Sequence, residues 1–344
     1  MRAAQYSATA GGIEKNLKLE EDVPDLVLPT NEPAALVEVL HASLNPQDYK
    51  IAELPVVGAL NVRRPASPGT DFVGRISDAS LPGFEKGDLV FGSLHLPTQH
   101  GTLGQFIIVK AADGVVKVPQ AYIDRGLDLR LLACLGTAGL TALQTFRNVE
   151  PGAHVFINGG SGGTGTFCIQ IARNVCQAER IVVTTSTPNT ELVRRMGADE
   201  AINYRDQDVI MRLEQAVGET GRKFDLVVDN VGNSEDLYWK SHRFLKTDGR
   251  FICIGAPNVN MSYALKLARM HIGARMPWSK SPQLITLFVE TKNEDLEKMA
   301  QWILEDNVTP VVHAKFRLED AAQAFADLKT GRTPAKLVID VAAD

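Results

Sequence analysis

Five glycines lie within residues 159–165, whose sequence is GGSGGTG, and this cluster is the first feature of the chain that suggests chemistry. A strand-like apolar segment precedes it, and a segment with apolar residues at helical spacing follows it. Such a turn lets a pyrophosphate approach the backbone, while the next helix N-terminus supplies N–H donors and partial positive charge. We therefore predict dinucleotide binding, with a purely structural turn as the alternative. The expected contacts are Ser161, Gly162, Gly163 and Thr164.

The end of the next predicted strand indicates which dinucleotide binds. NAD sites usually place Asp or Glu there, to bind the ribose 2′-hydroxyl. This chain has Thr185, Ser186 and Asn189 instead, which can surround a 2′-phosphate without repelling it. We predict NADPH, although the same residues could simply cap the following helix. Tyr204, after the third predicted strand, is expected near the adenine, with a surface tyrosine as the alternative.

Two patterns of elements must position these residues. The first 120 or so residues are short apolar, β-branched segments cut by Pro and Gly, which predicts a β-rich domain. From about Leu129, helical patterns alternate with near-continuous Val/Ile segments, which predicts βαβ units and a doubly wound parallel sheet. A C-terminal helix and strand should complete the β-rich domain. The strands are expected at 35–44, 69–77, 87–92, 104–110, 154–159, 180–185, 225–231, 250–255 and 335–341, and the last helix at 318–331.

Length and composition bound the remaining possibilities. The 344 residues suggest two domains, which we place at 1–125 with 268–344 and at 126–267. A net charge of −5 argues against a nucleic-acid surface. No apolar run approaches the roughly 20 residues of a membrane helix, and the N-terminus lacks the apolar region of a signal peptide, so a cytoplasmic protein is expected. None of the four cysteines forms a C-x-x-C pair.

The order and spacing of several segments resemble the medium-chain dehydrogenase/reductase superfamily, over nearly the whole chain. The similarity is to its zinc-independent branch of quinone oxidoreductases and trans-acting enoyl reductases, including fungal zinc-type alcohol dehydrogenase-like proteins. The resemblance implies an α/β fold with a GroES-like β-rich catalytic domain and a Rossmann domain. The segments are NPQDYK (45–50), PGTDFVG (68–74), GDLVFG (87–92), GTAGLTAL (136–143), GGSGGTG (159–165), MGADEAINYR (196–205), DNVG (229–232) and AKLVI (335–339).

The resemblance is informative where a metal would bind. Zinc-using relatives carry a Cys ligand in the place of Asn45 and a Gly-His-Glu motif at 69–71, where this chain has Gly-Thr-Asp. Cys134 falls near the third ligand's place, but one thiol does not make a zinc site, which needs three protein ligands. We therefore expect no metal.

The resemblance also assigns residues to the nicotinamide end of the site. It implies that Asn45 hydrogen-bonds the substrate oxygen, that Tyr49 or solvent supplies a proton, and that Lys50 donates to the substrate. Each of these residues also has a purely structural alternative. Asp48 and Lys50 could form an ion pair, Tyr49 could only pack, Thr137 and Thr141 could only cap a helix, and Lys336 could lie on the surface. The implied cofactor contacts are Pro46, Gln47, Asp48, Thr137, Thr141, Asn230, Val231, Ile254, Gly255 and Lys336.

Without a metal, the chemistry should be one that spreads charge. Hydride addition to an enone or quinone delocalises charge into an enolate, which a few hydrogen-bond donors can stabilise. We predict an NADPH-dependent reductase of a small molecule with a conjugated carbonyl, acting as a monomer or homodimer. Reduction of an imine or carbonyl, or a noncatalytic NADPH sensor, are the alternatives. The basic, Met-rich segment 264–283, with Trp278, forms core, shapes an acyl or aromatic pocket, or blocks an edge-strand dimer contact.

Overall fold

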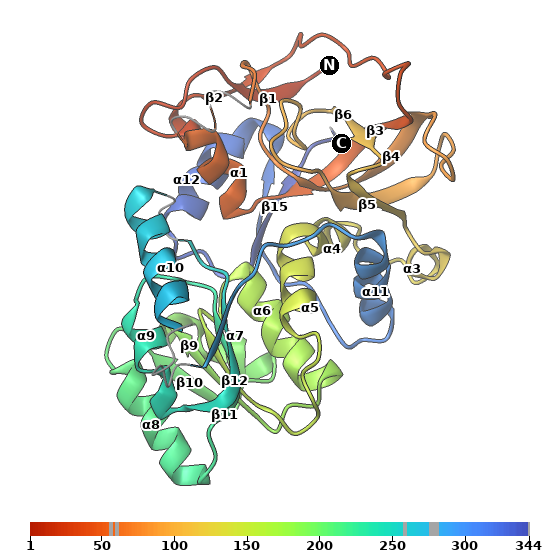
Figure 1. The fold of residues 1–344 in the computed structure, drawn as a ribbon. Helices are drawn as coiled ribbons and strands as arrows, with labels where there is room; N and C mark the ends of the chain where they lie inside the picture. Colours follow the sequence, from red (N-terminus) through yellow and green to blue (C-terminus); the bar gives the residue numbers. More distant parts are fainter. Residues whose placement is uncertain (55–57, 59–61, 257–259, 275–281, 343–344) are drawn as a thin grey trace. The chain divides into compact units, whose positions relative to one another are not determined.

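The computed structural model describes residues 1–54, 58, 62–256, 260–274 and 282–342. The chain forms two compact units, one of residues 1–140 with 290–344 and one of residues 141–289 (Figure 1). The sequence-based division at 126 and 268 differs from this one, because strand β13 (Gln283–Thr286) pairs with the parallel sheet of the second unit. Trp278 lies outside the described residues.

The first unit is built on an antiparallel sheet whose strand order, in the described residues, is β14-β15-β3-β4-β5-β7, with β6 also paired to β3. Only β14 and β15 are parallel neighbours. Every strand predicted for this part is confirmed, with ends that differ by at most two residues. The strands are β3 (Ala34–Ser43), β4 (Asp71–Ala79), β5 (Leu89–Ser93), β6 (Phe106–Lys110), β7 (Gly114–Lys117), β14 (Val312–Arg317) and β15 (Lys336–Asp340).

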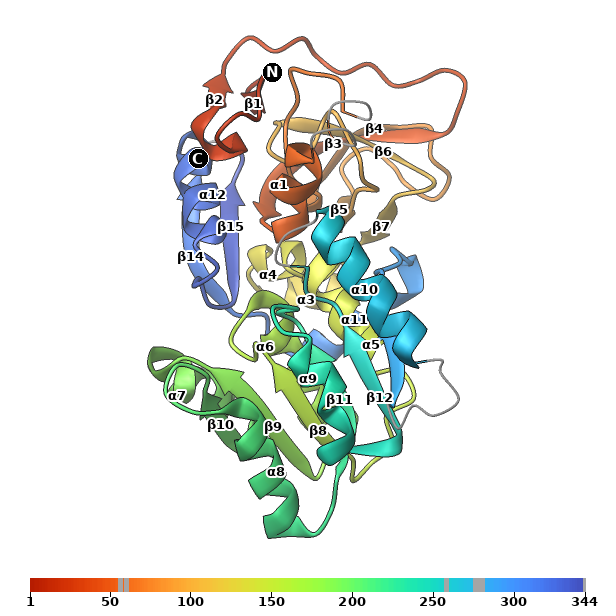
Figure 2. The same cartoon turned by 60° about the vertical axis from the view of Figure 1, so that its left-hand side comes forward.

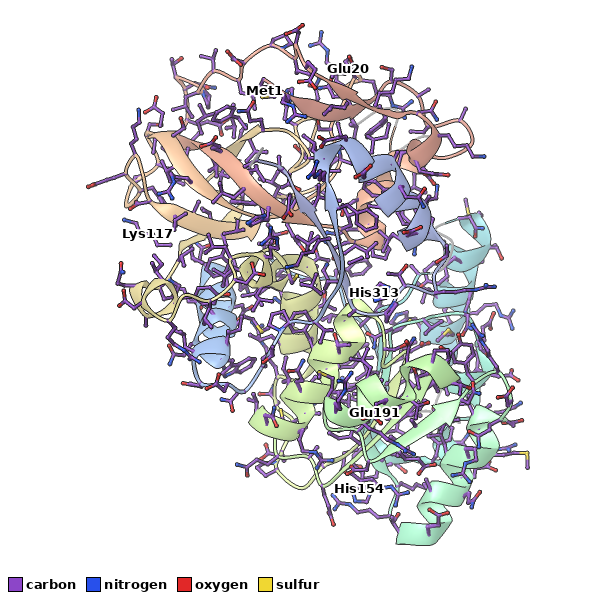
Figure 3. The ribbon with its side chains drawn as sticks, turned by 180° about the vertical axis from the view of Figure 1, so that it is seen from behind. Met1, Glu20, Lys117, His154, Glu191 and His313 are labelled. Carbon is purple, nitrogen blue, oxygen red and sulfur yellow. The ribbon has the colours of Figure 1, made fainter. Side chains whose placement is uncertain are left out.

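Smaller elements cover this sheet. The N-terminal strands β1 (Ala3–Tyr6) and β2 (Leu17–Glu20) form an antiparallel pair. The amino group of Met1 donates to the Val23 carbonyl (2.7 Å), which places the N-terminus close to the end of β2 (Figure 3). A π-helical turn at Leu135–Gly139 follows α4. The α-helices of the unit are α1 (Pro46–Glu53), α3 (Gln120–Asp124), α4 (Arg130–Ala133), α11 (Asn293–Leu304) and α12 (Ala321–Lys329).

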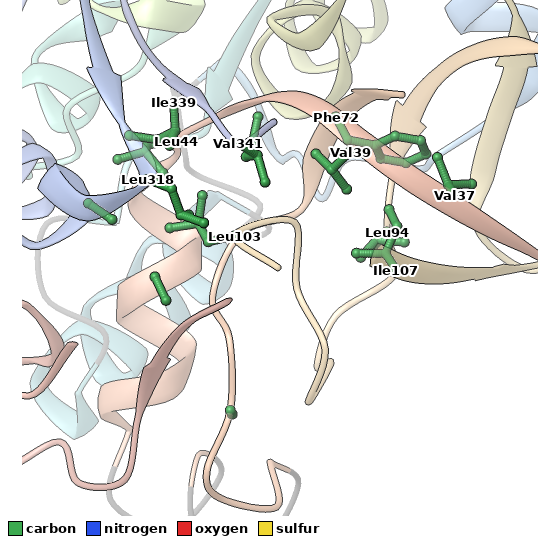
Figure 4. Close-up of a cluster of buried hydrophobic side chains, with 14 of the residues drawn as sticks. Val37, Val39, Leu44, Phe72, Leu94, Leu103, Ile107, Leu318, Ile339 and Val341 are labelled. Carbon is green, nitrogen blue, oxygen red and sulfur yellow. The ribbon is translucent and has the colours of Figure 1, made fainter. Parts of the chain in front are cut away.

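The core of the first unit joins segments from both ends of the chain. Val37 and Val39 of β3 and Phe72 of β4 are fully buried with Ile107 of β6 and Ile339 of β15 (Figure 4). Because β15 pairs with β3, the C-terminal strand completes the sheet that the N-terminal strands begin. The prediction that the C-terminal helix and strand close the β-rich part is confirmed.

The second unit contains a parallel sheet with strand order β10-β9-β8-β11-β12-β13 in the described residues. Numbered from β8, this is the order 3-2-1-4-5-6 of a doubly wound dinucleotide-binding fold. Figure 2 shows β9, β8, β11 and β12 side by side. The strands are β8 (His154–Asn158), β9 (Arg180–Thr185), β10 (Glu200–Asn203), β11 (Phe224–Asp229), β12 (Leu245–Cys253) and β13 (Gln283–Thr286).

Helices bury the faces of this sheet. Phe156, Val227 and Phe251 point to one face, where they pack with Leu213 of α8 and Met270 of α10. Their strand neighbours on the opposite face are buried as well, which explains the near-continuous apolar strand sequences. No helix in the described part of the chain is both long and apolar enough to span a membrane. The helices are α5 (Leu140–Thr145), α6 (Gly163–Gln170), α7 (Thr190–Arg195), α8 (Val209–Thr220), α9 (Asp236–Trp239) and α10 (Met261–Ala274).

Candidate active site

A buried carboxylate, Asp71, is the centre of a polar network in the first unit. Asp71 is the first residue of β4 and is fully buried. Its carboxylate accepts hydrogen bonds from the Asn45 side-chain amide (2.8 Å) and the Ser93 hydroxyl (2.9 Å). The backbone N–H and the hydroxyl of Thr137 also donate to it, each at 2.9 Å. These donors explain how a charge is accommodated without water.

Gly136 allows the carboxylate of Asp71 to come this close to the turn at Leu135–Gly139. A Cβ atom at position 136 would lie 2.3 Å from Asp71 Oδ1, so a side chain here would displace the carboxylate. The turn is π-helical, a rare conformation that often occurs at functional sites. The lack of a side chain at Gly136 therefore lets Asp71 reach the turn, and the hydrogen bonds to Asp71 orient Thr137.

Asn45 and Lys336 are held together deep in the network. Asn45 is 3% exposed, and Lys336, the first residue of β15, is 2% exposed. The Lys336 ammonium donates to Asn45 Oδ1 (2.5 Å) and the Leu44 carbonyl (3.0 Å), and lies 3.9 Å from Asp71 Oδ2. The Asn45 amide nitrogen contacts Asp71 and the Ser43 carbonyl (3.5 Å). Donation to a substrate oxygen would require Asn45 to give up one of these contacts.

Asp48 is a second buried carboxyl group beside this network. Its oxygens accept from the Asn45 backbone N–H (2.7 Å), at the start of α1, and from the Thr70 hydroxyl (3.1 Å). Burial, with the negative charge of Asp71, raises the pKa of Asp48 to about 7. Asp48 therefore keeps its proton to a much higher pH than a solvated aspartate does, because two buried carboxylates beside one ammonium would leave a net negative charge.

The half-buried side of the network is formed by Gln47 and Thr137. The Gln47 amide donates to the Thr137 hydroxyl (2.8 Å) and to the Thr70 hydroxyl (3.4 Å). Pro46, beside them, is exposed at the first position of α1, where proline favours helix initiation. These residues are the part of the network that a ligand in solution can approach.

Tyr49 belongs to a different cluster on α1. The Lys329 ammonium lies 5.1 Å from its ring centroid and also binds Glu14 (2.6 Å) and Glu53 (2.7 Å). Burial raises the pKa of Tyr49, which makes its phenol a weaker acid than a solvated tyrosine. Burial lowers the pKa of the half-buried Lys50, which makes its ammonium a stronger acid than a solvated lysine.

In the second unit, the glycine-rich turn has the geometry that its sequence predicts. Gly159 has φ 78°, in the region that favours glycine. A Cβ at Gly165 would lie 2.2 Å from the Gly159 carbonyl oxygen, so α6 can pack onto the turn only with glycine there. Gly162 caps α6 without a side-chain hydrogen bond, and Gly163 and Thr164 begin the helix. The helix N-terminus thus keeps backbone donors available for an anion.

A chain of side chains ties together the strand ends around the turn. Thr184 of β9 accepts from the Gly159 N–H (2.8 Å) and donates to Asn158 of β8 (2.6 Å). Asn158 donates in turn to Asp229 of β11 (2.8 Å), which accepts from the Val231 N–H (3.0 Å). The carboxyl ends of three adjacent strands are therefore fixed where ligands bind in doubly wound sheets.

The predicted 2′-phosphate residues come together at the tip of β9. The Asn189 amide lies 3.4 Å from the Ser161 hydroxyl and 3.4 Å from the Ser186 hydroxyl. Thr185 is buried beside them. Neither Ser186 nor Asn189 makes a side-chain capping bond to the helix it precedes, contrary to the capping alternative. Tyr204 is 51% exposed, and the Arg205 guanidinium lies 5.9 Å from its ring centroid.

Asn230 fits a ligand-binding role. Apart from a contact with the Cys168 thiol, its side-chain nitrogen and oxygen are buried without a hydrogen-bond partner among the described residues. Buried amide groups usually have hydrogen-bond partners, so the Asn230 side chain is suited to bind a polar group of a ligand. Gly255 packs against the backbone at Asn230, where a Cβ would lie 2.5 Å from its carbonyl oxygen. The N–H groups of Ile254 and Gly255 donate to the Asp229 carbonyl (2.9 and 3.0 Å). Thr141, on α5, is nearly buried.

The positions that correspond to zinc ligands in zinc-using relatives do not fit a metal ion. They offer the Asn45 amide, the Thr70 hydroxyl and the Asp71 carboxylate, with a lysine ammonium bound among them. Burial raises the pKa of Cys134 to about 12, so its thiol stays neutral. No group of three or more His, Cys, Asp or Glu residues in the described ranges is arranged to hold a metal.

Comparison with known proteins identifies the family. A family model described as alcohol dehydrogenase GroES-like domain matches residues 31–120, and one described as zinc-binding dehydrogenase matches residues 196–339. The trans-enoyl reductase pgmF of Aspergillus terreus is 34% identical over 362 aligned residues, which cover 99% of this chain and 96% of the relative. The chain belongs to the medium-chain dehydrogenase/reductase superfamily.

Two further proteins extend the comparison for this member of the superfamily. An NADPH-dependent alkenal/one oxidoreductase of Arabidopsis thaliana is 28% identical, covering 98% of this chain and 79% of the relative. The solved quinone oxidoreductase from Coxiella burnetii superposes with a TM-score of 0.83 at 26% identity, covering 99% of both chains. The predicted fold class is confirmed, and the protein is an oxidoreductase.

Sequence reasoning missed the residue on which the first-unit network depends. The sequence indicates Asp71 only as the place of a lost zinc ligand, and it assigns no role to Ser93 or Gly136. The GTAGLTAL motif contained a signal, because a glycine before a threonine permits another group to reach the turn.

Proposed function

We propose that this oxidoreductase is an NADPH-dependent reductase of an activated double bond, in an α,β-unsaturated carbonyl compound, a secondary-metabolite intermediate or a quinone. The observation that carries the proposal is the cluster of Ser161, Ser186 and Asn189 at the tip of β9, which presents neutral donors where an NAD site would present a carboxylate. The printed names of the relatives, an enoyl reductase and an NADPH-dependent alkenal/one oxidoreductase, support the same chemistry.

The residues of the second unit fit a phosphorylated dinucleotide. The backbone N–H groups at the start of α6 would bind the pyrophosphate, and the Ser161, Ser186 and Asn189 side chains would bind the 2′-phosphate. The buried amide of Asn230, whose only polar contact among the described residues is with the Cys168 thiol, suits the nicotinamide end together with Val231. Bound NADPH supplies the hydride that reduces the double bond. Contacts from Pro46, Thr141, Tyr204 and the loop at Ile254 and Gly255 are proposed as well.

The first unit would act on the substrate by hydrogen bonding and proton supply. On the accessible side, the Gln47 amide would donate to the oxygen of a developing enolate by exchanging its long contact with the Thr70 hydroxyl (3.4 Å). Thr137, whose hydroxyl donates to Asp71, would hold Gln47 in place. Lys50 is our preferred proton source, because its lowered pKa makes its ammonium the stronger acid; Tyr49 and solvent are the other candidates. Asn45 would complete the donor set by exchanging one of its internal contacts.

An experiment separates this proposal from its alternatives. Purified protein is incubated with NADPH, deuterated at the transferred position, and with a panel of enones and quinones, and the products are analysed by mass spectrometry and NMR. We expect deuterium at the β-carbon of a saturated product. Deuterium on a carbonyl or imine carbon would instead indicate another acceptor class. Binding of NADPH with no oxidation by any acceptor, at high protein concentration, would favour a noncatalytic sensor. A cytoplasmic location and a monomeric or homodimeric state are proposed as well.

A further inference from the structure

Lys336 is a buried cation in contact with Asn45 and Asp71, at two of the segments where the resemblance places the zinc ligands of zinc-using relatives. Its ammonium has three neighbours, Asn45 Oδ1 at 2.5 Å, the Leu44 carbonyl at 3.0 Å and Asp71 Oδ2 at 3.9 Å. All three are oxygen atoms. Asn45 stands where zinc-using relatives have a Cys ligand, and Asp71 lies in the segment where they have the Gly-His-Glu motif. The side chain is 2% exposed, so the charge of Lys336 must be balanced from within the protein.

The balancing charges are close at hand. Asp71 is fully buried and Asp48 is 4% exposed. Because the pKa of Asp48 is raised to about 7, the protonated form of Asp48 leaves Asp71 as the carboxylate that balances the one ammonium. Cys134, the remaining candidate ligand, is a neutral thiol. A divalent cation in this position would meet the Lys336 ammonium within the same set of oxygen atoms. The network is therefore complete with a lysine and excludes a metal by charge.

We propose that the Lys336 ammonium takes over the electrostatic role of the metal ion, as the counter-charge that holds Asn45 and Asp71. Asp71 in turn fixes Thr137 through two donors, and Thr137 accepts from Gln47 at the accessible side of the network. Lys336 thus acts as a positioning residue for the donors that the proposed function assigns to the substrate. This role rests on that function for its kinetic consequence only, and it differs from the cofactor contact that the sequence predicts for Lys336.

The test compares Lys336→Met, which keeps the length of the side chain, with Lys336→Arg and with the double variant Lys336→Met/Asp71→Asn. The matched control is Lys315→Met, on the neighbouring strand β14, where the lysine is 50% exposed and forms an ion pair with Asp128. Urea unfolding, NADPH titration by fluorescence, metal content and steady-state kinetics are measured for each protein, with kinetics at a temperature where every variant is folded.

We expect Lys336→Met to raise the equilibrium constant for unfolding on the order of a hundred-fold or more, because it leaves Asp71 buried without its counter-charge. The Asp71→Asn change should recover much of that loss, and Lys315→Met should have almost no effect. The value of kcat should fall at least about ten-fold in Lys336→Met, with KM and the NADPH Kd nearly unchanged, and Lys336→Arg should recover part of the loss of kcat.

Other results would overturn the proposal. One is an equilibrium constant for unfolding of Lys336→Met that matches that of the control, and another is a loss of stability that Asp71→Asn does not reduce. Stoichiometric zinc in the wild type, or weakened NADPH binding by Lys336→Met with unchanged kcat, would also overturn it. If the wild type reduces no acceptor, the proposed function fails, and the double variant still decides whether Lys336 neutralises Asp71.

Discussion

Replacing Ser186 with Asp should convert the proposed preference for NADPH into one for NADH. Ser186 is 8% exposed and its hydroxyl lies 3.4 Å from the Asn189 amide, so a carboxylate there would project into the cluster that we assign to the 2′-phosphate. The same carboxylate can accept a hydrogen bond from the ribose 2′-hydroxyl of NADH, as acidic residues do at this place in NAD sites. The substitution therefore tests the cluster with both nucleotides.

The magnitude follows from the charge. Two unit charges about 4 Å apart repel by about 4 kcal/mol at an effective dielectric constant of about 20. Solvent at the tip of β9, and the exposed Arg194 and Arg195 on the helix that follows, will screen part of this repulsion. A net loss of about 1.5 to 3 kcal/mol corresponds to roughly a ten-fold to hundred-fold increase in the NADPH Kd. The NADH Kd should stay within about three-fold or decrease.

Fluorescence titration of each nucleotide measures both constants directly. Ser186→Asn is the matched control, because it changes size without adding charge, and it should weaken the two nucleotides by similar small amounts. Thermal unfolding checks that the buried carboxylate has not unfolded the domain. Equal losses for NADPH and NADH in Ser186→Asp would refute the assignment of the β9 tip to the 2′-phosphate.

Two other predictions concern backbone space and pH. Gly165→Ala should abolish binding of both nucleotides, because its Cβ would lie 2.2 Å from the Gly159 carbonyl oxygen. The control Gly218→Ala, which has open space around it, should be neutral or slightly stabilising. Intact nucleotide binding by Gly165→Ala in a titration would contradict this prediction. The raised pKa of Asp48, about 7, favours its protonated form in the folded state, so its contribution to stability is present below about pH 4 and is lost as the pH rises through about 7. Urea unfolding across this range should show a loss of a few kcal/mol that Asp48→Asn removes and the exposed control Asp78→Asn keeps; parallel curves for wild type and Asp48→Asn would count against it.

Local sequence patterns predicted the parts of the fold that local interactions determine. The strand, turn and helix around residues 154–170 follow from periodicity and glycine placement, and the structure confirms them. The hydroxyl and amide residues after β9 were predicted as a group because they are close in sequence. Ser161 joins them since β8 and β9 are adjacent parallel strands, whose carboxyl ends meet at one edge of the sheet.

The network around Asp71 could not be predicted in the same way. Lys336 and Asn45 are 291 residues apart, and Asp71 and Thr137 are 66 residues apart. Their contacts depend on the pairing of β15 with β3, which no local pattern specifies. The burial of Lys336 is unusual for a lysine, so a surface position or a ligand contact was the more natural expectation.

The proposed reaction is the reduction of a conjugated double bond by NADPH on this protein, without a metal ion. A single-turnover measurement tests it most directly: the protein is stripped with a chelator, its residual metal is quantified by mass spectrometry, and NADPH absorbance is followed after mixing with an enone that the untreated protein reduces. We expect an unchanged rate of NADPH oxidation at negligible metal content. Loss of that rate on stripping, with recovery on addition of zinc, would contradict it.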